Sequence, residues 1–359
     1  MPAERIVVAM SGGVDSSLAA YLLKEAGYEV IGITMQIWPN NAPASHEGGC
    51  CSLAAVSDAR RVADQLDIAY YVLNMQEAFE HSVIRYFVDE YRRGRTPNPC
   101  IACNRYLKFD LLIRKALALE AEAVATGHYA RIRRDESGRY QLLRAVDESK
   151  DQSYALYPLT QEQLARIRFP LGDYRKSEIR KLAARLGLAT AGKPESQEIC
   201  FIHDNDYRRY LRQEAGLPDR PGPIEDRRGR RLGTHRGIEF YTIGQRRGLG
   251  LAHPEPLYVI DIIPERNAVV VGTADETLAA GLEVGEVNYV SVPRPWAPTQ
   301  CQAKIRYGAP PVDCLLQPIG EGARVEFGEP QRAVTPGQAV VFYQGDLVLA
   351  GGTIERALH

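Results

Sequence analysis

The sequence predicts an α/β N-terminal domain with a parallel sheet, followed by two small β-rich domains, the last a β-barrel. Two observations carry this prediction. Strand-like and helix-like segments alternate through the first half of the chain, which is typical of a parallel sheet covered by helices. After about residue 205, glycine and proline separate short β-rich segments, which is typical of small barrels. We place the domains at residues 1–205, 206–280 and 281–359.

The individual elements follow from hydrophobic spacing and from glycine and proline positions. An uninterrupted apolar segment at residues 6–10 predicts a buried strand, and apolar residues at helical spacing predict a following helix that ends at Gly27. The first domain should contain strands at 6–10, 30–35, 69–73 and 123–126, and helices at 16–26, 52–66, 78–92 and 104–119. Later strands are expected at 257–263, 268–271, 287–292, 303–306, 324–327 and 339–343.

Composition and charge limit the function classes. With 45% hydrophobic and 25% charged residues, the chain has an ordinary globular composition. No apolar segment approaches the ~20 residues of a membrane-spanning helix and no signal peptide is evident, so we expect a cytoplasmic protein without a membrane partner. A formal net charge of −1 means that a nucleic acid would have to bind local patches. Arginine clusters at 131–134, 208–212, 227–231 and 246–247 are candidates, although each alone is more typical of a solvated surface.

A glycine-rich loop between a predicted strand and a predicted helix is the strongest local signal. Residues 11–17 read Ser-Gly-Gly-Val-Asp-Ser-Ser. Gly12 and Gly13 allow backbone N–H groups to approach an anion, and the positive end of the following helix faces the same point. Serine hydroxyls add donors, and Asp15 can help to hold Mg²⁺ on phosphates. The pattern predicts phosphate binding rather than a simple connection, and the missing lysine excludes a Walker loop.

This loop resembles the PP-loop of the ATP pyrophosphatases. That resemblance implies binding of the β,γ-pyrophosphate of ATP and cleavage of ATP to AMP and pyrophosphate. The group contains amide-forming ligases as well as tRNA-thiolating enzymes, so the loop alone does not select a substrate.

The chain contains seven cysteines. An odd number in a cytosolic-looking chain argues against a structural disulfide framework, which leaves the thiols for catalysis, metal binding or burial. Cys103 precedes the predicted helix 104–119, whose dipole favours a thiolate. Cys200 lies near the end of the α/β domain, so only the fold can bring the two together. Cys50 and Cys51 are expected in a packed turn before a helix capped by Ser52. The remaining pair in the β segments, Cys301 and Cys314, is expected in the core.

Further motifs in order along the chain resemble those of the tRNA-specific 2-thiouridylases, the MnmA/TrmU family. They are residues 11–17, 49–52, Asn98-Pro99 with Cys103-Asn104, 126–130, 150–154, Cys200 with its flanks, 244–250 and 304–307. The resemblance covers nearly the whole chain. It implies an N-terminal PP-loop domain, a small central domain and a C-terminal β-barrel, in agreement with the change in composition described above.

The resemblance also implies residue roles. ATP, with Mg²⁺, would contact the loop and two further positions: Ala9, Met10, Ser11, Gly12, Gly13, Val14, Asp15, Ser16, Met35 and Gly127. The tRNA or its target base would contact Asn98, Pro99, Cys100, His128, Lys150, Asp151, Gln152, Arg306, Tyr307 and Gln344. Cys200 would carry a persulfide and Cys103 would be the nucleophile. His128 follows a predicted strand at the ligand edge of the sheet, which favours a site role over a structural one.

The chemistry that the resemblance implies is coherent. Adenylation of the O2 atom of the wobble uridine turns that oxygen into a good leaving group, and sulfur then attacks C2. If the sulfur is the outer atom of a Cys200 persulfide, the Cys103 thiolate can attack the inner sulfur, which releases sulfide and leaves a disulfide. The base must leave its stack to reach such a pocket, which costs little in a single-stranded anticodon loop.

Cys100 departs from the common pattern, since many members of this family carry an acidic residue there. Cys100 and Cys103 form a C-x-x-C pair, and with Cys200 they supply three thiolates, enough for a 4Fe–4S cluster with one open iron. Such a cluster would deliver sulfide without a persulfide. Two readings therefore stay open, the catalytic cysteine pair and the cluster, beside the simpler one in which Cys100 is a small buried residue. Zinc would need a fourth ligand that we do not identify.

Two other functions compete with tRNA thiolation. A PP-loop amide ligase would need neither Cys103 nor Cys200, and a tRNA-binding module without catalysis would not need an intact phosphate loop. For the thiolating enzyme, the resemblance implies the tRNAs for Lys, Glu and Gln. It also implies a sulfur donor, either a persulfide relay protein or a cysteine desulfurase.

Overall fold

The computed structural model describes residues 3–38, 53–193, 199–202, 204–295 and 297–359, and the chain forms two compact units. The first unit consists of Met1–Val83, Cys100–Asn205 and Gly345–Val348. The second consists of Ile84–Pro99, Asp206–Gln344 and Leu349–His359. The domain boundaries after residues 205 and 280 stay predictions. Among the described residues, no helix is both long enough and apolar enough to cross a membrane.

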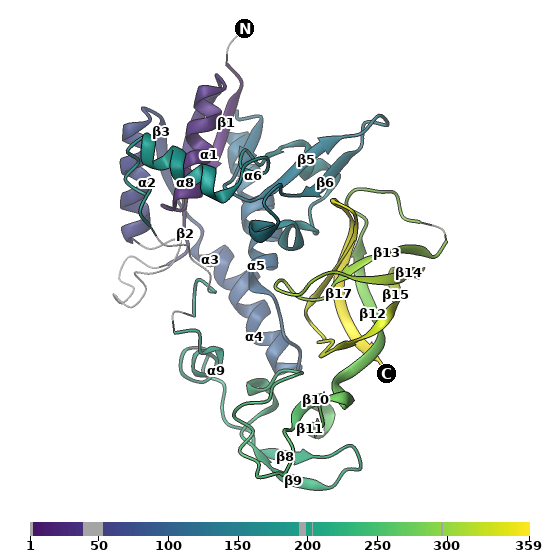
Figure 1. Cartoon of the computed structure of the whole chain (residues 1–359). Coiled ribbons are helices and arrows are strands. Elements are labelled where there is room, and N and C mark those ends of the chain that lie inside the picture. Colours follow the sequence, from purple (N-terminus) through teal and green to yellow (C-terminus); the bar gives the residue numbers. More distant parts are fainter. Residues whose placement is uncertain (1–2, 39–52, 194–198, 203, 296) are drawn as a thin grey trace. The chain divides into compact units, whose positions relative to one another are not determined.

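The first unit is built on a parallel sheet, as the sequence predicted (Figure 1). Within the described residues it has the strand order β3-β2-β1-β4-β7. The strands are β1 (Arg5–Ala9), β2 (Glu29–Gln36), β3 (Ala69–Asn74), β4 (Ala123–Ala125) and β7 (Ile167–Arg168). Ile6, Val7 and Val8 of β1 are fully buried because both faces of a parallel sheet are covered. Strand β7 is too short to have given a sequence signal.

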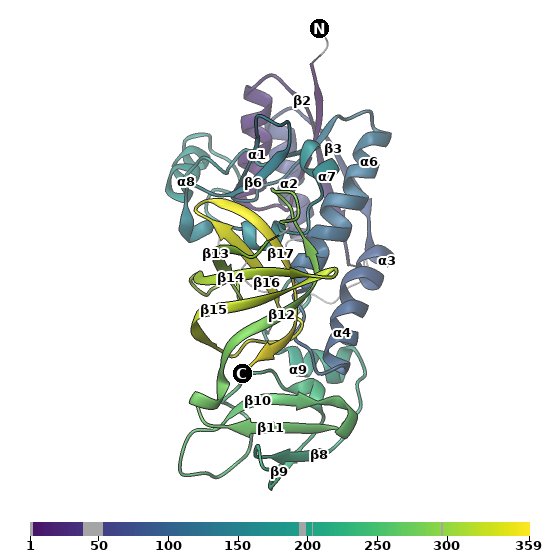
Figure 2. The same ribbon diagram turned by 90° about the vertical axis from the view of Figure 1, so that its right-hand side faces the viewer.

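Helices cover both faces of this sheet (Figure 2). On one face, α1 (Val14–Glu25), α2 (Leu53–Gln65) and α8 (Lys176–Arg185) share a hydrophobic core with β1, β2 and β4. Leu18, Val62 and Ile179 are among the fully buried side chains of this core. On the other face, α6 (Leu112–Ala118) contacts β4. The predicted helices at 16–26 and 52–66 are thus confirmed.

The helix predicted at 104–119 begins earlier than expected. It starts with α5 (Pro99–Ala102), continues as the π-helical segment η3 (Cys103–Leu111) and ends with α6. Proline is favoured at the first helical position because its fixed φ suits a helix and its missing N–H would be unpaired there anyway. Cys103 is therefore not at the helix start, and the dipole argument applies to Cys100 in the first turn instead. The prediction at 78–92 corresponds to α3 (Gln76–Phe79), η2 (Glu80–Ile84) and α4 (Arg85–Arg92).

A β-hairpin in the first unit was missed in the sequence. Strands β5 (Ala130–Arg134) and β6 (Tyr140–Arg144) are antiparallel, and Leu347 pairs with Leu143 of β6. The arginine cluster at 131–134 lies on β5. Arg131 forms an ion pair with Asp346 at 2.8 Å, so part of this basic patch is used within the fold.

The second unit contains a four-stranded sheet in the order β10-β11-β8-β9. Its strands are β8 (Gly222–Glu225), β9 (Arg231–His235), β10 (Tyr258–Ile263) and β11 (Ala268–Gly272). The predictions at 257–263 and 268–271 are confirmed. The arginine cluster at 227–231 occupies the turn between β8 and β9, where Arg230 pairs with Asp226 at 3.1 Å.

The second unit also contains a closed barrel, as predicted. Its strand order is β12-β15-β14-β13-β16-β17, and pairing of β12 with β17 closes it. The strands are β12 (Leu278–Asn288), β13 (Thr299–Lys304), β14 (Val312–Ile319), β15 (Gly322–Arg332), β16 (Ala339–Gln344) and β17 (Leu347–Leu358), of which Leu349 onward belongs to this unit. Cys301 and Cys314 are buried in this barrel, as expected.

The strand predicted at 287–292 was wrong, because β12 runs from Leu278 to Asn288. A Cβ at Gly281 would lie 2.2 Å from the Val325 carbonyl oxygen, and the pairing with β15 shifts register beside Gly281. The close approach of two barrel strands therefore requires glycine there.

The remaining helices are short. They are η4 (Glu148–Lys150), η5 (Ser153–Leu156), α7 (Gln161–Ala165), α9 (Tyr207–Arg209), η6 (Tyr210–Glu214), η7 (Ile238–Phe240), η8 (Pro264–Arg266) and η9 (Asp275–Thr277). Cys50, Cys51 and Ser52, expected in a turn before α2, lie outside the described residues.

Candidate active site

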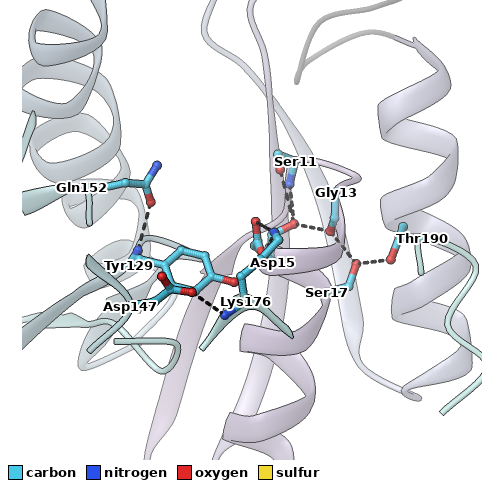
Figure 3. Close-up of polar contacts among 10 residues, drawn as sticks. Ser11, Gly13, Asp15, Ser17, Tyr129, Asp147, Gln152, Lys176 and Thr190 are labelled. Atoms are coloured by element: carbon cyan, nitrogen blue, oxygen red, sulfur yellow. Dashed lines mark hydrogen bonds and ion pairs between the residues drawn. The ribbon is translucent and has the colours of Figure 1, made fainter. Parts of the chain in front are cut away.

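The glycine-rich loop joins β1 to α1 at the carboxyl edge of the sheet, as the sequence predicted (Figure 3). Ser16 Oγ accepts a hydrogen bond from the backbone N–H of Ser11 and donates one to the carbonyl oxygen of Gly13, both at 3.1 Å. Ser17 Oγ donates to the same carbonyl at 2.9 Å. These two hydroxyls therefore stabilise the loop rather than serving first as ligand donors. The N-cap residue of α1 is Gly13, which has no side chain to occupy the N–H groups of the first turn.

Two glycines are required by close approach. Gly12 has φ +70°, and a Cβ there would lie 2.3 Å from the carbonyl oxygen of Ala55. A Cβ at Gly127 would lie 2.7 Å from the backbone nitrogen of Ser16. The first turn of α1 is thus bordered by two glycines, Gly12 and Gly127, whose backbone is not covered by side chains of their own. An uncapped helix N-terminus with this open backbone fits the phosphates of a nucleotide.

The residues predicted to contact ATP come from neighbouring strands. The stretch from Ala9 to Ser16 follows β1, Met35 lies near the end of β2, and Gly127 follows β4. Strands β2 and β4 pair with β1 on its two sides, so their carboxyl ends meet at one edge of the sheet. The fold therefore brings these residues together, although their individual roles stay predictions.

Asp15 is held by two residues that the sequence analysis did not single out. Both carboxylate oxygens accept hydrogen bonds from Lys176 Nζ at 2.7 Å, and Tyr129 Oη donates to Oδ1 at 2.8 Å (Figure 3). The ammonium group also lies 5.5 Å from the centre of the Tyr129 ring. No local pattern could have revealed Lys176, because it is far from Asp15 in the sequence.

The predicted tRNA segment 150–152 lies beside these residues. Gln152 Oε1 accepts from the backbone N–H of Tyr129 at 2.9 Å. Asp151 is buried, and its carboxylate accepts from the N–H of Ala145, from the N–H of Ser153 and from Ser153 Oγ at 2.8–3.2 Å. These hydrogen bonds stabilise the conformation of residues 150–152. The contact of Asp151 with tRNA stays a prediction.

Replacing Asp151 with Asn should lower thermal stability. The substitution removes the negative charge that strengthens three buried hydrogen bonds, and it places an NH₂ group against Ser153 Oγ, which must then accept instead of donate; the expected cost is on the order of 1–3 kcal/mol. We expect a lower melting temperature for D151N, measured by calorimetry. An Asp173→Asn variant changes an exposed carboxylate of the same unit and should leave the melting temperature unchanged. Equal melting temperatures for D151N and the wild type would contradict this role.

His128 follows β4 at the ligand edge, as predicted. Its Nδ1 lies 2.6 Å from Thr126 Oγ1, and its ring lies 5.7 Å from that of Phe109 and 5.9 Å from that of Phe169. Burial holds the pKa of His128 well below its usual range, and the positive charge of Lys108 lowers it further. The imidazole is therefore neutral at neutral pH.

A half-buried histidine with a lowered pKa makes stability depend on pH. In the unfolded chain, His128 gains a proton below about pH 6.5, whereas in the folded chain its pKa is lower, so stability falls as the pH drops through that region. We expect the melting temperature of the wild type to fall more between about pH 7.5 and pH 5.5 than that of a His128→Gln variant. Identical falls would show that His128 does not contribute.

Two segments that carry the predicted catalytic cysteines contact the same short helix, α3. Cys103 begins η3, and η3 contacts α3. Phe201, next to Cys200, packs edge-on against Phe79 of α3 at 5.9 Å. Cys103 and Cys200 are both half-buried. The segments on which the two cysteines lie therefore approach one helix, and the pairing of Cys103 with Cys200 stays a prediction.

An aromatic contact connects this neighbourhood to the nucleotide edge. Trp38 follows the end of β2, and the centre of its ring lies 5.9 Å from that of Phe79. The Phe79 ring therefore packs against both Trp38 and Phe201. Gln76 Nε2 donates to the carbonyl oxygen of Trp38. The segments predicted to carry the sulfur chemistry and the loop that fits phosphates thus belong to one compact unit.

Comparison with known proteins agrees with this combination of features. A family model described as the tRNA methyl transferase HUP domain matches residues 4–204. A second model, the tRNA methyl transferase PRC-barrel domain, matches residues 210–273, and a third, the Aminomethyltransferase beta-barrel domain, matches residues 279–354. The tRNA-specific 2-thiouridylase MnmA of Symbiobacterium thermophilum is 56% identical over 99% of this chain and 93% of its own length. The MnmA of Moorella thermoacetica is 58% identical over 97% and 99%. That of Clostridium perfringens is 52% identical over the full length of both chains.

The chain belongs to the tRNA-specific 2-thiouridylase family. As in the sequence prediction for this family, the N-terminal part is a PP-loop-type α/β domain and the C-terminal part contains a closed barrel.

The cluster alternative is not supported by the arrangement of the thiols in this 2-thiouridylase. Within the described part of the chain, no group of three His, Cys, Asp or Glu side chains is placed to hold a metal ion. Cys100, Cys103 and Cys200 are all among the described residues. Cys100 is exposed, which excludes the reading that it is a small buried residue.

The other predicted tRNA contacts of this 2-thiouridylase belong to the second unit. Asn98 and Pro99 lie at the beginning of α5, and Gln344 ends β16. Arg306 and Tyr307 lie between β13 and β14, where Tyr307 is 50% exposed and Lys304 Nζ lies 5.5 Å from its ring centre. An exposed aromatic ring beside cationic groups suits a nucleic-acid surface. These residues stay predictions as tRNA contacts.

Proposed function

We propose that this protein is an ATP-dependent tRNA 2-thiouridylase that converts the wobble uridine, position 34 of the tRNA, to 2-thiouridine. ATP would bind at the loop from Ala9 to Ser16, with Met35 and Gly127, and Mg²⁺ would accompany the phosphates. Its reaction would adenylate the uracil O2 atom, and sulfur would then displace AMP at C2. The single observation that carries this proposal is that α3 contacts both η3, the segment that begins at Cys103, and Phe201, next to Cys200, in the unit that holds the phosphate loop.

Two cysteines would transfer the sulfur, and other residues would bind the tRNA. Cys200 would carry sulfur as a persulfide, and Cys103 would attack its inner sulfur, forming the Cys103–Cys200 disulfide and releasing sulfide for attack on C2. Two electrons are then needed from a thiol reductant to restore both cysteines. Contacts to the tRNA and target base would come from Asn98, Pro99, Cys100, His128, Lys150, Asp151, Gln152, Arg306, Tyr307 and Gln344.

The partners in this proposal are tRNAs for Lys, Glu and Gln and a cytoplasmic sulfur donor, either a persulfide relay protein or a cysteine desulfurase. An amide ligase of the PP-loop group would share the phosphate loop, but it would have no use for two cysteines beside it. Curated relatives along the whole chain are named as 2-thiouridylases, which also favours thiolation.

The test is an anaerobic assay on an unmodified tRNA transcript with ATP, Mg²⁺ and a persulfide donor, with 2-thiouridine and AMP both quantified. Iron-free protein and protein reconstituted with iron and sulfide are compared. We expect full activity without iron. Activity only after reconstitution would overturn the persulfide mechanism, and absence of 2-thiouridine in both samples would overturn the proposed function.

A further inference from the structure

The Asp15 carboxylate occupies the second position of α1, at the end of the helix that fits the phosphates. Its side chain is 31% exposed, while that of Lys176 beneath it is only 8% exposed. Lys176 reaches it from the first residue of α8, and both of its short hydrogen bonds go to this carboxylate. The buried ammonium is thus fixed below the carboxylate rather than placed in solvent.

In this inference Asp15 is held by Lys176 rather than bound to Mg²⁺ as the sequence analysis expected, and a carboxylate without a metal ion has a charge of the wrong sign for a nucleotide site. The N-terminal turn of α1 favours an anion, but an uncompensated Asp15 would repel the phosphates over a few ångströms. Lys176 neutralises that charge, and the Tyr129 hydroxyl fixes the orientation of the carboxylate. Breaking the buried pair would leave one charge without compensation, which is the costly outcome for a buried ion pair.

The same two residues also hold the segment predicted to contact tRNA. The backbone N–H of Lys176 donates to Asp147 Oδ2 at 2.9 Å, and Asp147 Oδ1 accepts from the N–H of Ser149 at the start of η4. At the other end of this segment, Gln152 Oε1 accepts from the N–H of Tyr129 (Figure 3). Lys176 and Tyr129 therefore contact both the phosphate loop and residues 147–152.

From this arrangement we propose that Lys176 is a positioning residue for nucleotide binding. It supplies a positive charge beside the loop, in addition to Lys193, whose Nζ donates to the Gly12 carbonyl oxygen at 3.2 Å. Lys176 acts indirectly, by holding and neutralising Asp15 rather than by contacting the phosphates. Tyr129 assists by fixing one carboxylate oxygen. This inference rests on the proposed ATP-dependent function, of which it is a refinement.

The test measures binding of a non-hydrolysable ATP analogue with Mg²⁺ by calorimetry, without tRNA, together with the melting temperature of each unliganded variant. We compare Lys176→Met, Tyr129→Phe and the double variant D15N/K176M. Lys181→Met is the control, because Lys181 is an exposed lysine of the same helix.

We expect K176M to weaken nucleotide binding by about tenfold or more, since a carboxylate without its cation then faces the phosphates. Removing that carboxylate as well should restore part of the affinity, so D15N/K176M should bind at least about threefold more tightly than K176M. Y129F should show a smaller loss in the same direction, and K181M should bind as the wild type does.

Two results would overturn the role of Lys176: wild-type affinity in K176M, or a double variant that binds no more tightly than K176M. If K176M does not fold, unchanged affinity in both Y129F and D15N/K176M would overturn it equally. Failure of the wild type to bind the analogue would overturn this inference and ATP use together. Normal nucleotide binding without any thiolation would count only against the proposed function.

Discussion

Replacing Cys103 or Cys200 with serine is expected to abolish 2-thiouridine formation, with a loss of about a thousandfold or more for either change. A serine hydroxyl can neither carry a persulfide sulfur nor attack one, so the exchange between the two positions has no substitute. Nucleotide binding should be unchanged, because neither cysteine lies in the phosphate loop. The measurement is 2-thiouridine content of a tRNA transcript by mass spectrometry after a fixed reaction time.

The control for this prediction is Cys301→Ala, which removes a thiol buried in the barrel of the second unit. Activity per folded molecule should be retained in that variant. Full thiolation by C103S or C200S would contradict the paired mechanism. Loss of thiolation with the same melting temperature as the wild type would support it, since α3 and its neighbours would then be intact.

Replacing Gly12 with alanine is expected to weaken binding of ATP by about a hundredfold or more. The new Cβ would lie 2.3 Å from the carbonyl oxygen of Ala55, and backbone at the start of α2 cannot move away as a flexible side chain would. The loop must then shift, which displaces the N–H groups that are proposed to bind the phosphates. Calorimetric titration with Mg²⁺ and an ATP analogue measures the effect.

Gly187→Ala is a matched control for the cost of left-handed backbone. Gly187 has φ +60°, close to the +70° of Gly12, but a Cβ there meets nothing within 4 Å. Both variants therefore carry the same strain of roughly 1–2 kcal/mol, and only G12A carries the clash. G12A and G187A with equal nucleotide affinity would show that the approach of Ala55 does not shape the loop.

The parallel sheet and its loop were predictable because their signals are local. The apolar segment that became β1 is continuous, since a strand buried on both faces needs no polar alternation. The glycines that follow it mark a sharp connection to α1. Such signals depend on neighbouring residues alone, so they remain readable without knowledge of the rest of the fold.

Elements whose form depends on distant partners were predicted less well. Strand β12 contains Gly281 because of the approach of Val325, whereas the sequence analysis placed a strand only at 287–292. The start of the helix that carries Cys103 was placed too late, because a proline was read as part of a loop although it suits the first helical position. Both errors concern element boundaries, where local preference is weakest.

The sequence by itself determined the order of the elements, the phosphate loop and the cysteines available for sulfur chemistry, and through its ordered motifs it indicated the family. Tertiary structure alone decided which distant residues meet. It placed η3 and Phe201, which carry or adjoin the two cysteines, against α3, and it set Lys176 against Asp15. The physical reason is that a contact between distant residues depends on the path of the whole chain through the packed core, and no local spacing encodes that path.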